Sequence, residues 1–280
     1  MTSANESVAV LDHGYVKYVE HWGSDERVVE AARMSTGKGF LGWDPGPCPA
    51  CTGDRLQVTG HSSEGSGSIL AQSASREPQA VCSACEGSGK VRGDLKLLAY
   101  LWEHRHATPF EMAGVVLEVQ APIFVFREWH RHRTQSYNEM SSRYVPLPDL
   151  NYVPSVERLL SNSKTNKQAG LAKGAADLTP EKAEEYRVIL RATYLTLEAI
   201  YQGALVSGVP KELARIHLPV GRYSRMRVSA NLRNWLAFLT LRMDPAAQWE
   251  IRQYAEAVGE TLSRLYPRTW ELFSKGIKST

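Results

Sequence analysis

Residues 121–144, APIFVFREWHRHRTQSYNEMSSRY, join a short apolar run to a dense group of cationic side chains. These cationic residues are Arg127, His130, Arg131, His132, Arg133 and Arg143. A basic run is commonly a solvated helix face, but such a face would carry Lys and Glu, whereas Trp129, Gln135 and Tyr137 lie among these arginines. Guanidinium groups bind phosphate through two hydrogen bonds and stack on rings, while amides and hydroxyls recognise the edges of heterocycles. The stretch therefore indicates an anion-binding site.

The same stretch resembles the signature of a known family. Arg131-His132-Arg133 is followed after seven residues by Ser141, as in the flavin-dependent thymidylate synthases. Four further blocks resemble this family in the right order: AARMS at Ala31–Ser35, HATPFE at His106–Glu111, ARIHLP at Ala214–Pro219 and NLRNWLAFLTLRMDPAAQWEI at Asn231–Ile251. The resemblance covers nearly everything outside residues 43–92 and the two ends. It implies an α+β fold, a mixed or antiparallel sheet flanked by helices, in one synthase domain spanning residues 1–280.

The resemblance also implies a reaction. It is the conversion of dUMP to dTMP, with 5,10-methylenetetrahydrofolate as carbon donor and reduced FAD, recharged by NADPH, as hydride donor. The family works without a protein nucleophile, and this sequence agrees, because it has no His-activated serine pattern and its four cysteines stand in two tight pairs. Members of the family are homotetramers with shared active sites. The expected partners are therefore dUMP, folate and further copies of the chain.

Site residues follow by matching them to the family motif. The residues matched to dUMP binding are Arg131, Glu139, Ser141, Arg143, Arg215 and Arg242. The residues matched to FAD binding are Ser35, Thr108, Arg131, His132, Arg133, Glu139, Asn231 and Arg233, with His106 near the same pocket. Arg242 is the catalytic candidate, since a guanidinium beside a uracil carbonyl stabilises the negative charge that develops as hydride reaches C6.

Two positions depart from the family, and two arginines need partners. Glu128 stands where relatives often have Gln, and Ala237 where some have an Asn facing the flavin. Glu128 places an acid beside the phosphate-binding arginines and is expected to weaken dUMP binding or to reorient the bound dUMP.

Arg233 and Arg242 emerge from an otherwise apolar segment. A buried arginine is costly unless paired, so each is expected to meet a carboxylate or a phosphate.

Residues 43–92 form an insertion that the family does not usually carry. Gly, Ser and Pro dominate it, which indicates turns rather than a packed core. Cys48-x-x-Cys51 and Cys82-x-x-Cys85 supply four thiolates in two knuckles, which favours a tetrahedral structural zinc in a zinc-ribbon-like segment. Redox dithiols and an iron–sulfur site are the competing interpretations. The sequence leaves its role open between a stability clip, a subunit contact and a nucleic-acid contact.

Composition excludes several classes of protein. The chain has 280 residues, of which 43% are hydrophobic and 22% charged, as in ordinary globular proteins. No apolar run approaches the roughly 20 residues of a membrane span, and the start MTSANESVAV lacks a signal core, so a cytoplasmic protein is expected. A formal net charge of +3 suits anionic small molecules better than nucleic acid.

Local patterns predict the elements around the central stretch. Alternation predicts strands within Val8–His21, Gly114–Gln120 and Met226–Asn231, and helical periodicity predicts Asp25–Met34, Asp94–His106, Leu232–Met243, Ala246–Leu265 and Arg268–Lys275. Ser24, Asp94 and Thr179 are the expected N-caps. Proline at the first position predicts a short helix from Pro122 and a long one over Thr179–Ser207. The long helix carries an apolar stripe, expected in the core or at a subunit interface.

A second class of function competes with the enzyme. A zinc-ribbon nucleic-acid-binding protein would use the Arg/His stretch for phosphate contacts and Trp129 and Tyr137 as base-stacking platforms. It explains the insertion better, but it does not explain the arginines of the distant apolar segments.

Overall fold

The computed structural model describes residues 7–51, 82–161 and 177–277. It divides into two compact units. Residues Met1–Trp22 and Ala113–Thr280 form the first, called the sheet unit below. Gly23–Met112 form the second, the knuckle unit, which contains the whole of residues 43–92. Among the described residues, no helix combines the length and apolar character needed to cross a membrane.

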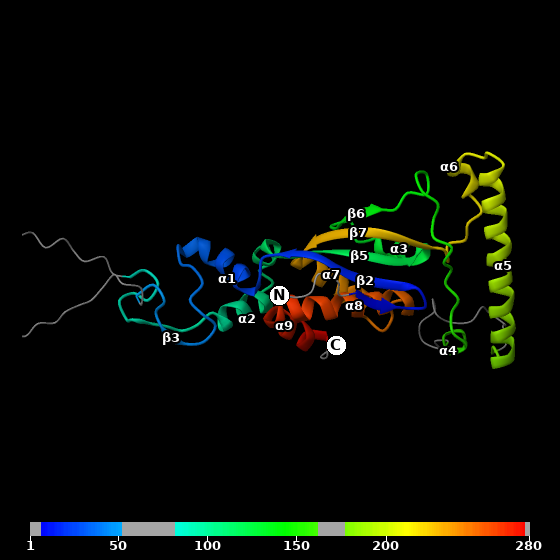
Figure 1. Cartoon of the computed structure of the whole chain (residues 1–280). Coiled ribbons are helices and arrows are strands. Elements are labelled where there is room, and N and C mark those ends of the chain that lie inside the picture. Colours follow the sequence, from blue (N-terminus) through cyan, green and yellow to red (C-terminus); the bar gives the residue numbers. More distant parts are fainter. Residues whose placement is uncertain (1–6, 52–81, 162–176, 278–280) are drawn as a thin grey trace, which may run out of the picture. The chain divides into compact units, whose positions relative to one another are not determined.

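The sheet unit is built on five antiparallel strands in the order β1-β2-β5-β7-β6 (Figure 1). Their bounds are β1 Ser7–Val10, β2 Gly14–Trp22, β5 Gly114–Pro122, β6 Ser136–Glu139 and β7 Tyr223–Asn231. The predicted strands are confirmed, and β7 begins three residues before the predicted Met226. The edge strand β6 was not predicted, because its four residues, SYNE, are polar and show no alternation.

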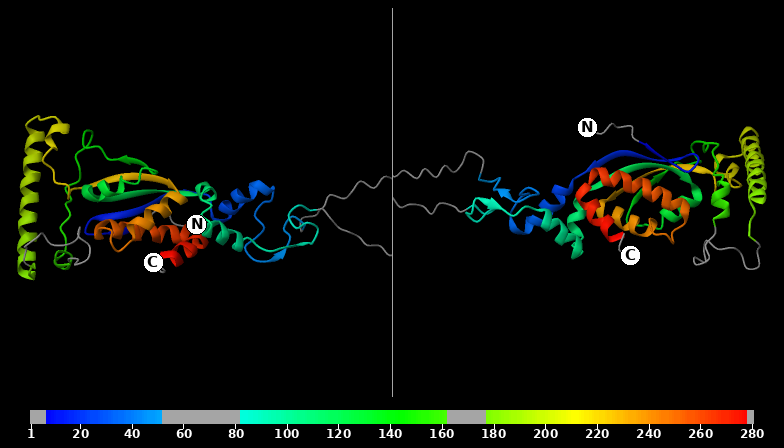
Figure 2. Two further views of the ribbon diagram at one scale, coloured as in Figure 1. Left: turned by 180° about the vertical axis from the view of Figure 1, so that it is seen from behind. Right: turned by 90° about the horizontal axis from the view of Figure 1, so that it is seen from below.

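Helices cover one face of this sheet. The helices of the unit are α3 Ile123–Trp129, α4 Val156–Leu160, α5 Pro180–Val206, α6 Lys211–Ala214, α7 Leu232–Arg242, α8 Trp249–Leu265 and α9 Pro267–Ile277. Of these, α3, α7 and α8 pack on the strands, and α9 packs on α8, as the view from below shows (Figure 2). Val115, Leu117 and Val119 of β5 point into this layer and are fully buried. Expectation and structure therefore agree on an α+β fold with an antiparallel sheet.

Trp129, at the end of α3, lies at the centre of the core. Its side chain is fully buried and its ring stacks on Phe238 of α7, with 4.6 Å between centroids. Trp235 meets the same Phe238 edge to face. Trp129 is therefore not the base-stacking platform of the nucleic-acid hypothesis, since it has no exposed face on which a base can stack.

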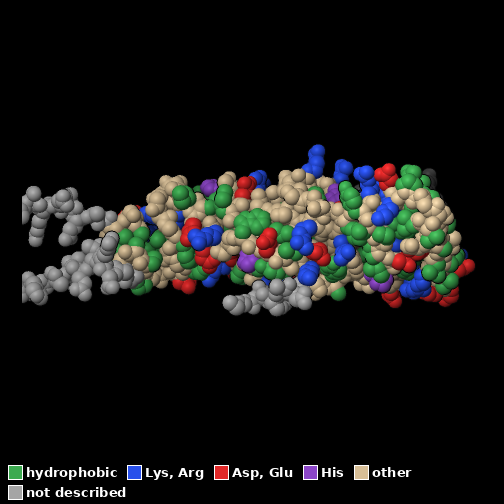
Figure 3. Space-filling view, turned by 45° about the horizontal axis from the view of Figure 1, so that its top comes forward, with side chains coloured by type: hydrophobic (Ala, Val, Ile, Leu, Met, Phe, Trp, Pro, Cys, Tyr) green, Lys and Arg blue, Asp and Glu red, His purple; other side chains and the backbone are tan. Residues whose placement is uncertain are grey.

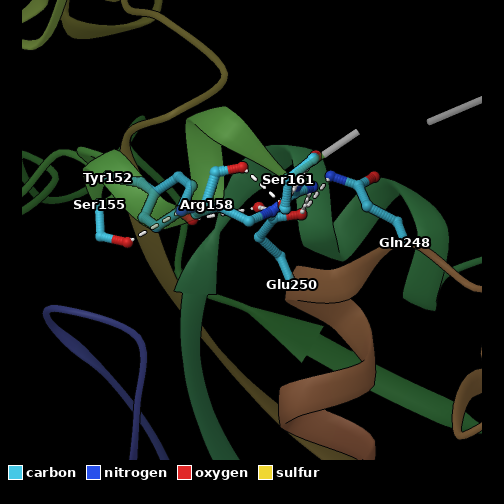
Figure 4. A network of polar contacts seen from close by, with 6 residues as sticks. All are labelled: Tyr152, Ser155, Arg158, Ser161, Gln248 and Glu250. Carbon is cyan, nitrogen blue, oxygen red and sulfur yellow. Dashed lines mark hydrogen bonds and ion pairs between the residues drawn. The ribbon is translucent and has the colours of Figure 1, made fainter. Parts of the chain in front are cut away.

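Glu250, in the first turn of α8, ties that helix to α4 (Figure 4). Arg158 donates from Nε to Oε1 over 2.7 Å and from Nη2 to Oε2 over 3.2 Å, while Tyr152 donates its hydroxyl to Oε1 over 3.1 Å. Gln248 donates to Oε2 over 2.8 Å, and Ser155 caps α4 at the Arg158 N–H. The sequence predicted a helix here but not this polar network, whose members come from separate segments.

The long helix α5 is capped by Thr179 and has Pro180 in its first turn, as predicted. Its apolar stripe is only partly covered: Tyr186, Ile189 and Ile200 are 48%, 56% and 53% exposed, whereas Leu190, Tyr194 and Leu197 are half-buried and Tyr201 is buried. Hydrophobic side chains are visible over α5 (Figure 3). Part of the stripe therefore packs within the chain, as a core stripe does, and part is exposed, as an uncovered subunit interface is.

The knuckle unit holds α1 Asp25–Arg33, the 3-10 turn η1 Met34–Thr36, the strand pair β3 Gly46–Pro47 and β4 Lys90–Val91, α2 Leu95–Glu103 and the 3-10 turn η2 Thr108–Met112. Ser24 caps α1 by accepting from the Arg27 N–H, as predicted. Asp94 occupies the N-cap position of α2, but its side chain does not cap that helix, which corrects the prediction. Its carboxylate instead accepts hydrogen bonds from the Arg33 side chain and from the Leu41 N–H.

Candidate active site and cysteine cluster

Arg242, at the end of α7, is held by the end of α3. Its Nη1 donates to Glu128 Oε2, its Nη2 to the Glu128 carbonyl and its Nε to His132 Nε2, each over 2.9 Å. The side chain is 18% exposed, so the expected carboxylate partner is present and is Glu128. Burial raises the pKa of Glu128, and the Arg242 charge offsets only part of this effect. The departure from Gln at position 128 therefore acts directly on the catalytic candidate.

The contact with Arg242 fixes the protonation of His132. Because a guanidinium can only donate, His132 Nε2 must be the unprotonated nitrogen, and the ring proton lies on Nδ1. Burial, together with the neighbouring Arg242 charge, lowers the pKa of His132 to about 4. His132 is therefore neutral at physiological pH, and its ring packs edge to face on Phe238.

The loop between α3 and β6 is shaped by a buried amide. Gln135 is buried and accepts a 3.0 Å hydrogen bond from Trp129 Nε1, while Tyr137 donates to the His132 carbonyl over 2.7 Å. Burial raises the pKa of Tyr137 to about 12, so its hydroxyl stays a donor. With these residues turned inward, Arg131 and Arg133 are left exposed. Gln135 and Tyr137 thus position the basic loop, a role that sequence reasoning missed.

A polar pocket of about 230 Å³ opens beside β6 and β7. It is lined by Ile123, Glu139, Met140, Ser141, Ser142, Leu147, Arg215 and Ser224. Arg215 Nη1 donates to Ser142 Oγ over 2.6 Å, which directs the guanidinium into this wall. Ser224 is 1% exposed, and its hydroxyl finds no hydrogen-bond partner among the described residues. The pocket thus offers a cation and a hydroxyl without a partner; neither Ser142 nor Ser224 was a candidate from the sequence.

The structure brings only some of the predicted residues together. Glu139, Ser141 and Arg215 share the pocket, whereas Arg143 does not line it and pairs with Glu212 Oε2 over 3.1 Å on the surface. Asn231 caps α7 by accepting from the Asn234 N–H over 3.0 Å. Besides Glu139 and Arg143, the exposed predicted residues are Arg131, Arg133 and Arg233 in the sheet unit and Ser35, His106 and Thr108 in the knuckle unit.

The four cysteines converge in the knuckle unit. Cys48 and Cys82 place their sulfurs 3.9 Å apart and Cys51 and Cys85 3.5 Å apart, and all four lie within 4.8 Å of one another. These distances exclude disulfides, whose sulfurs lie about 2.05 Å apart. A tetrahedral Zn²⁺ with Zn–S bonds of about 2.3 Å places its sulfurs about 3.8 Å apart. A hydrogen bond from the Cys85 N–H, together with the Cys51 thiol, lowers the pKa of Cys82 to about 6. The cluster therefore has the donors and the size of a tetrahedral thiolate site.

Known proteins resemble this chain over most of its length. The family model described as thymidylate synthase complementing protein matches residues 17–268. A flavin-dependent thymidylate synthase of Thermus thermophilus is 35% identical over 269 residues, covering 96% of this chain and 78% of the relative. The corresponding enzyme of Rickettsia prowazekii is 32% identical over 279 residues, covering 96% and 79%.

A solved structure agrees with these relatives. The UMP/dUMP methylase PolB from Streptomyces cacaoi, bound with 5-Br dUMP, superimposes with a TM-score of 0.67 at 28% identity, covering 96% of this chain and 97% of that one. The family match, the relatives and the shared fold agree with the signature of the central stretch. This chain belongs to the thymidylate synthase complementing protein family, the family of the flavin-dependent thymidylate synthases.

Proposed function

We propose that this protein is a flavin-dependent thymidylate synthase that methylates dUMP to dTMP. The observation that carries the proposal is the polar pocket, in which Arg215 meets Glu139 and Ser141 from a distant part of the sequence. All three stand at positions that the family motif matches to dUMP binding. The Arg215 guanidinium and the Ser224 hydroxyl suit a phosphate, which accepts charge-assisted hydrogen bonds. Arg131 and Arg143, both exposed, complete the proposed dUMP set.

Arg242 is the proposed catalytic residue. It is oriented by Glu128 and by neutral His132, so its position does not depend on substrate. A preorganised guanidinium of this kind stabilises negative charge on a uracil carbonyl, as an oxyanion hole does. Because Glu128 already neutralises part of its charge, we expect dUMP to compete with that carboxylate for Arg242.

The FAD-binding residues are proposed from the family motif. Arg131 and Arg133 flank His132 and offer cationic donors of the kind that a diphosphate requires. Asn231, Arg233 and Glu139, with Ser35 and Thr108 of the knuckle unit, complete the proposed set. Bound FAD would supply the hydride, NADPH would reduce it, and methylenetetrahydrofolate would supply the carbon. The protein's own contribution is to place flavin and pyrimidine against each other and to keep water out.

Self-association is the proposed use of α5. The exposed part of its apolar stripe, Tyr186, Ile189 and Ile200, lies on one face of the helix, with each side chain about half exposed. A second copy of the chain that covers this stripe fits the homotetramer with shared active sites that the resemblance implies.

We further propose that residues 43–92 are a zinc-binding insertion in one synthase domain. We also propose that the protein acts in the cytoplasm.

Product formation tests the proposal. Purified protein with FAD, NADPH, methylenetetrahydrofolate and dUMP is expected to form dTMP. Arg242→Ala is expected to lower kcat about 10²- to 10³-fold, the loss caused by removing one such donor elsewhere. Arg252→Ala is the matched control, since Arg252 contacts the Pro245 carbonyl on the surface of α8. If neither FAD nor dUMP binds while an oligonucleotide binds with steep salt dependence, the nucleic-acid alternative replaces the enzyme.

A further inference from the structure

One buried carboxylate connects the cysteine cluster to the end of α1. Asp94 is fully buried, and its Oδ1 accepts hydrogen bonds from Arg33 Nε, over 2.9 Å, and Nη2. Its Oδ2 accepts from the Leu41 N–H over 2.7 Å. Arg33 is the last residue of α1, and residues 34–40 lie between the two donors. Asp94 therefore holds both ends of the segment that contains Ser35.

The same segment is packed on the cysteines. The side chain of Leu41 belongs to a small buried cluster with Cys48, Cys85 and Val91. Two backbone hydrogen bonds strengthen the junction, from the Asp94 N–H to the Gly42 carbonyl over 2.8 Å and from the Leu95 N–H to the Trp43 carbonyl. Leu41 thus connects the cluster, through its side chain, to Asp94, through its N–H.

The junction is also close-packed on its other side. Gly93 has φ +76°, a conformation that favours glycine, and a Cβ there would lie 2.5 Å from the Trp43 carbonyl oxygen. Trp43 in turn donates from Nε1 to Glu26 of α1 over 3.0 Å. α1 packs on η2, which begins at Thr108. A chain of direct contacts within one unit therefore runs from the cysteines to both turns that carry proposed FAD residues.

The apolar part of this cluster is too small to hold the junction without help. Among the described residues, its buried members are Leu41, Cys48, Cys85 and Val91, so two of the four are cysteines. In small cysteine-rich modules, metal binding supplies the folding free energy that such a core lacks, and the ligands separate when the metal is removed. Loss of metal would therefore remove the packing surface of Leu41 and, with it, one of the two strong partners of Asp94.

We propose that metal bound at Cys48, Cys51, Cys82 and Cys85 sets the affinity for FAD by holding residues 34–42 in place through Leu41 and Asp94. The proposal rests on the proposed function, in which Ser35 and Thr108 contact FAD. It assigns the insertion a positioning role within its own unit, in contrast to a nucleic-acid contact or a subunit contact. We expect the hydrogen-exchange protection of the backbone of residues 34–42 and the affinity for FAD to rise and fall together.

The experiment compares three states of the full-length protein: zinc-loaded, stripped by a chelator under reducing conditions, and reloaded with Zn²⁺ alone. Hydrogen exchange measures protection of residues 34–42, and flavin fluorescence measures the FAD dissociation constant. Stripping is expected to remove the protection and weaken FAD binding about tenfold, within the range of about 5- to 150-fold usual for coupled sites. Reloading with Zn²⁺ is expected to restore both quantities.

A variant separates the junction from the metal. Asp94→Asn keeps the side-chain volume but removes the charge that Arg33 requires, so it is expected to retain one zinc per chain while losing protection and FAD affinity. Glu30→Gln is the matched control, because Glu30 pairs with Arg27 on the exposed side of the same helix. It is expected to behave as the parent protein in all three measurements.

The outcomes distinguish the two proposals. If the zinc-loaded chain fails to bind FAD, the proposed function falls, while the exchange data still test whether metal orders residues 34–42. If FAD binds equally tightly with and without metal, or if Asp94→Asn leaves FAD affinity and protection unchanged, the positioning role is wrong. A cluster that takes up no Zn²⁺ at all also overturns it.

Discussion

The sheet unit and the knuckle unit hold their candidate residues in different ways. In the sheet unit, His132 and Arg242 are placed by helices anchored in an apolar core that includes Trp129, Trp235 and Phe238. In the knuckle unit, Ser35 belongs to a segment held by one carboxylate and a cluster of cysteines. The first arrangement depends on packed volume, and the second on ligands and charges. The two units should therefore respond to different perturbations, and each prediction below tests that contrast.

Removal of a cysteine is expected to have the largest effect. Cys48→Ser replaces a fully buried cysteine of the proposed zinc site, so the knuckle unit should lose bound metal and its ordered structure, as zinc-dependent modules do. The sheet unit should keep its own unfolding transition, because its core contains none of these residues. Zinc analysis with calorimetry of the full chain checks both points. A single transition that shifts as a whole would show that the two units do not unfold independently.

Truncation of the core is the converse test. Trp129→Ala removes a fully buried indole stacked on Phe238 and is expected to destabilise the sheet unit by about 3–5 kcal/mol. Zinc content should not change. Urea unfolding measures the loss, with Tyr144→Ala as the control, since Tyr144 is 76% exposed. Loss of zinc from the Trp129 variant would contradict the separation of the two units.

The structure shows where sequence patterns were sufficient and where they were not. Alternation in β5 and the Thr179-Pro180 start of α5 were readable because they are local. Position alone suggested that Asp94 caps α2, and it failed because Arg33, 61 residues earlier, competes for the carboxylate. Arg222 was missed altogether; it is 1% exposed and is paired with Glu198 of α5, a contact that no local pattern encodes.

The candidate site divides in the same manner. Arg131, His132, Arg133 and Ser141 came from one contiguous motif, but their roles came from the family resemblance. Ser224, Gln135 and the partnership of Glu128 with Arg242 required the fold, since each depends on which segments meet. Residue types thus indicated the chemistry, whereas tertiary contacts decided which groups are available for it.

A polar contact inside the sheet unit sharpens the comparison, because there charge and packing coexist. Glu250 is buried, which by itself raises its pKa, but hydrogen bonds from Arg158 and Gln248 outweigh this and leave the pKa lowered. The stabilisation is therefore present above the unfolded pKa of about 4.3 and is lost as pH falls through the lower folded value.

Glu250→Gln leaves Arg158 without a carboxylate and is expected to cost about 3 kcal/mol near neutral pH, at the lower end for a broken buried pair because Arg158 is partly exposed. The difference from the parent protein should shrink as pH falls below about 4. Urea unfolding across this range measures it. A penalty that stays constant down to the lowest pH would mean that shape, and not charge, is what Glu250 contributes.

The smallest effect is expected at the matching pair, Glu128 and Arg242, in the candidate active site. Glu128→Gln keeps an acceptor for Arg242 Nη1 but removes the negative charge that faces the guanidinium. Glu128 is 27% exposed, against 4% for Glu250, so solvent screens part of this charge interaction and dUMP binding is expected to tighten only about threefold. Glu271→Gln is the control, since Glu271 pairs with Lys275 on the exposed side of α9. Titration calorimetry with dUMP at low and high salt measures the change.

Weaker dUMP binding by the Glu128 variant would mean that the carboxylate orients Arg242 more than it competes with the substrate. The pair of Glu128 and Arg242 would then resemble the pair of Glu250 and Arg158.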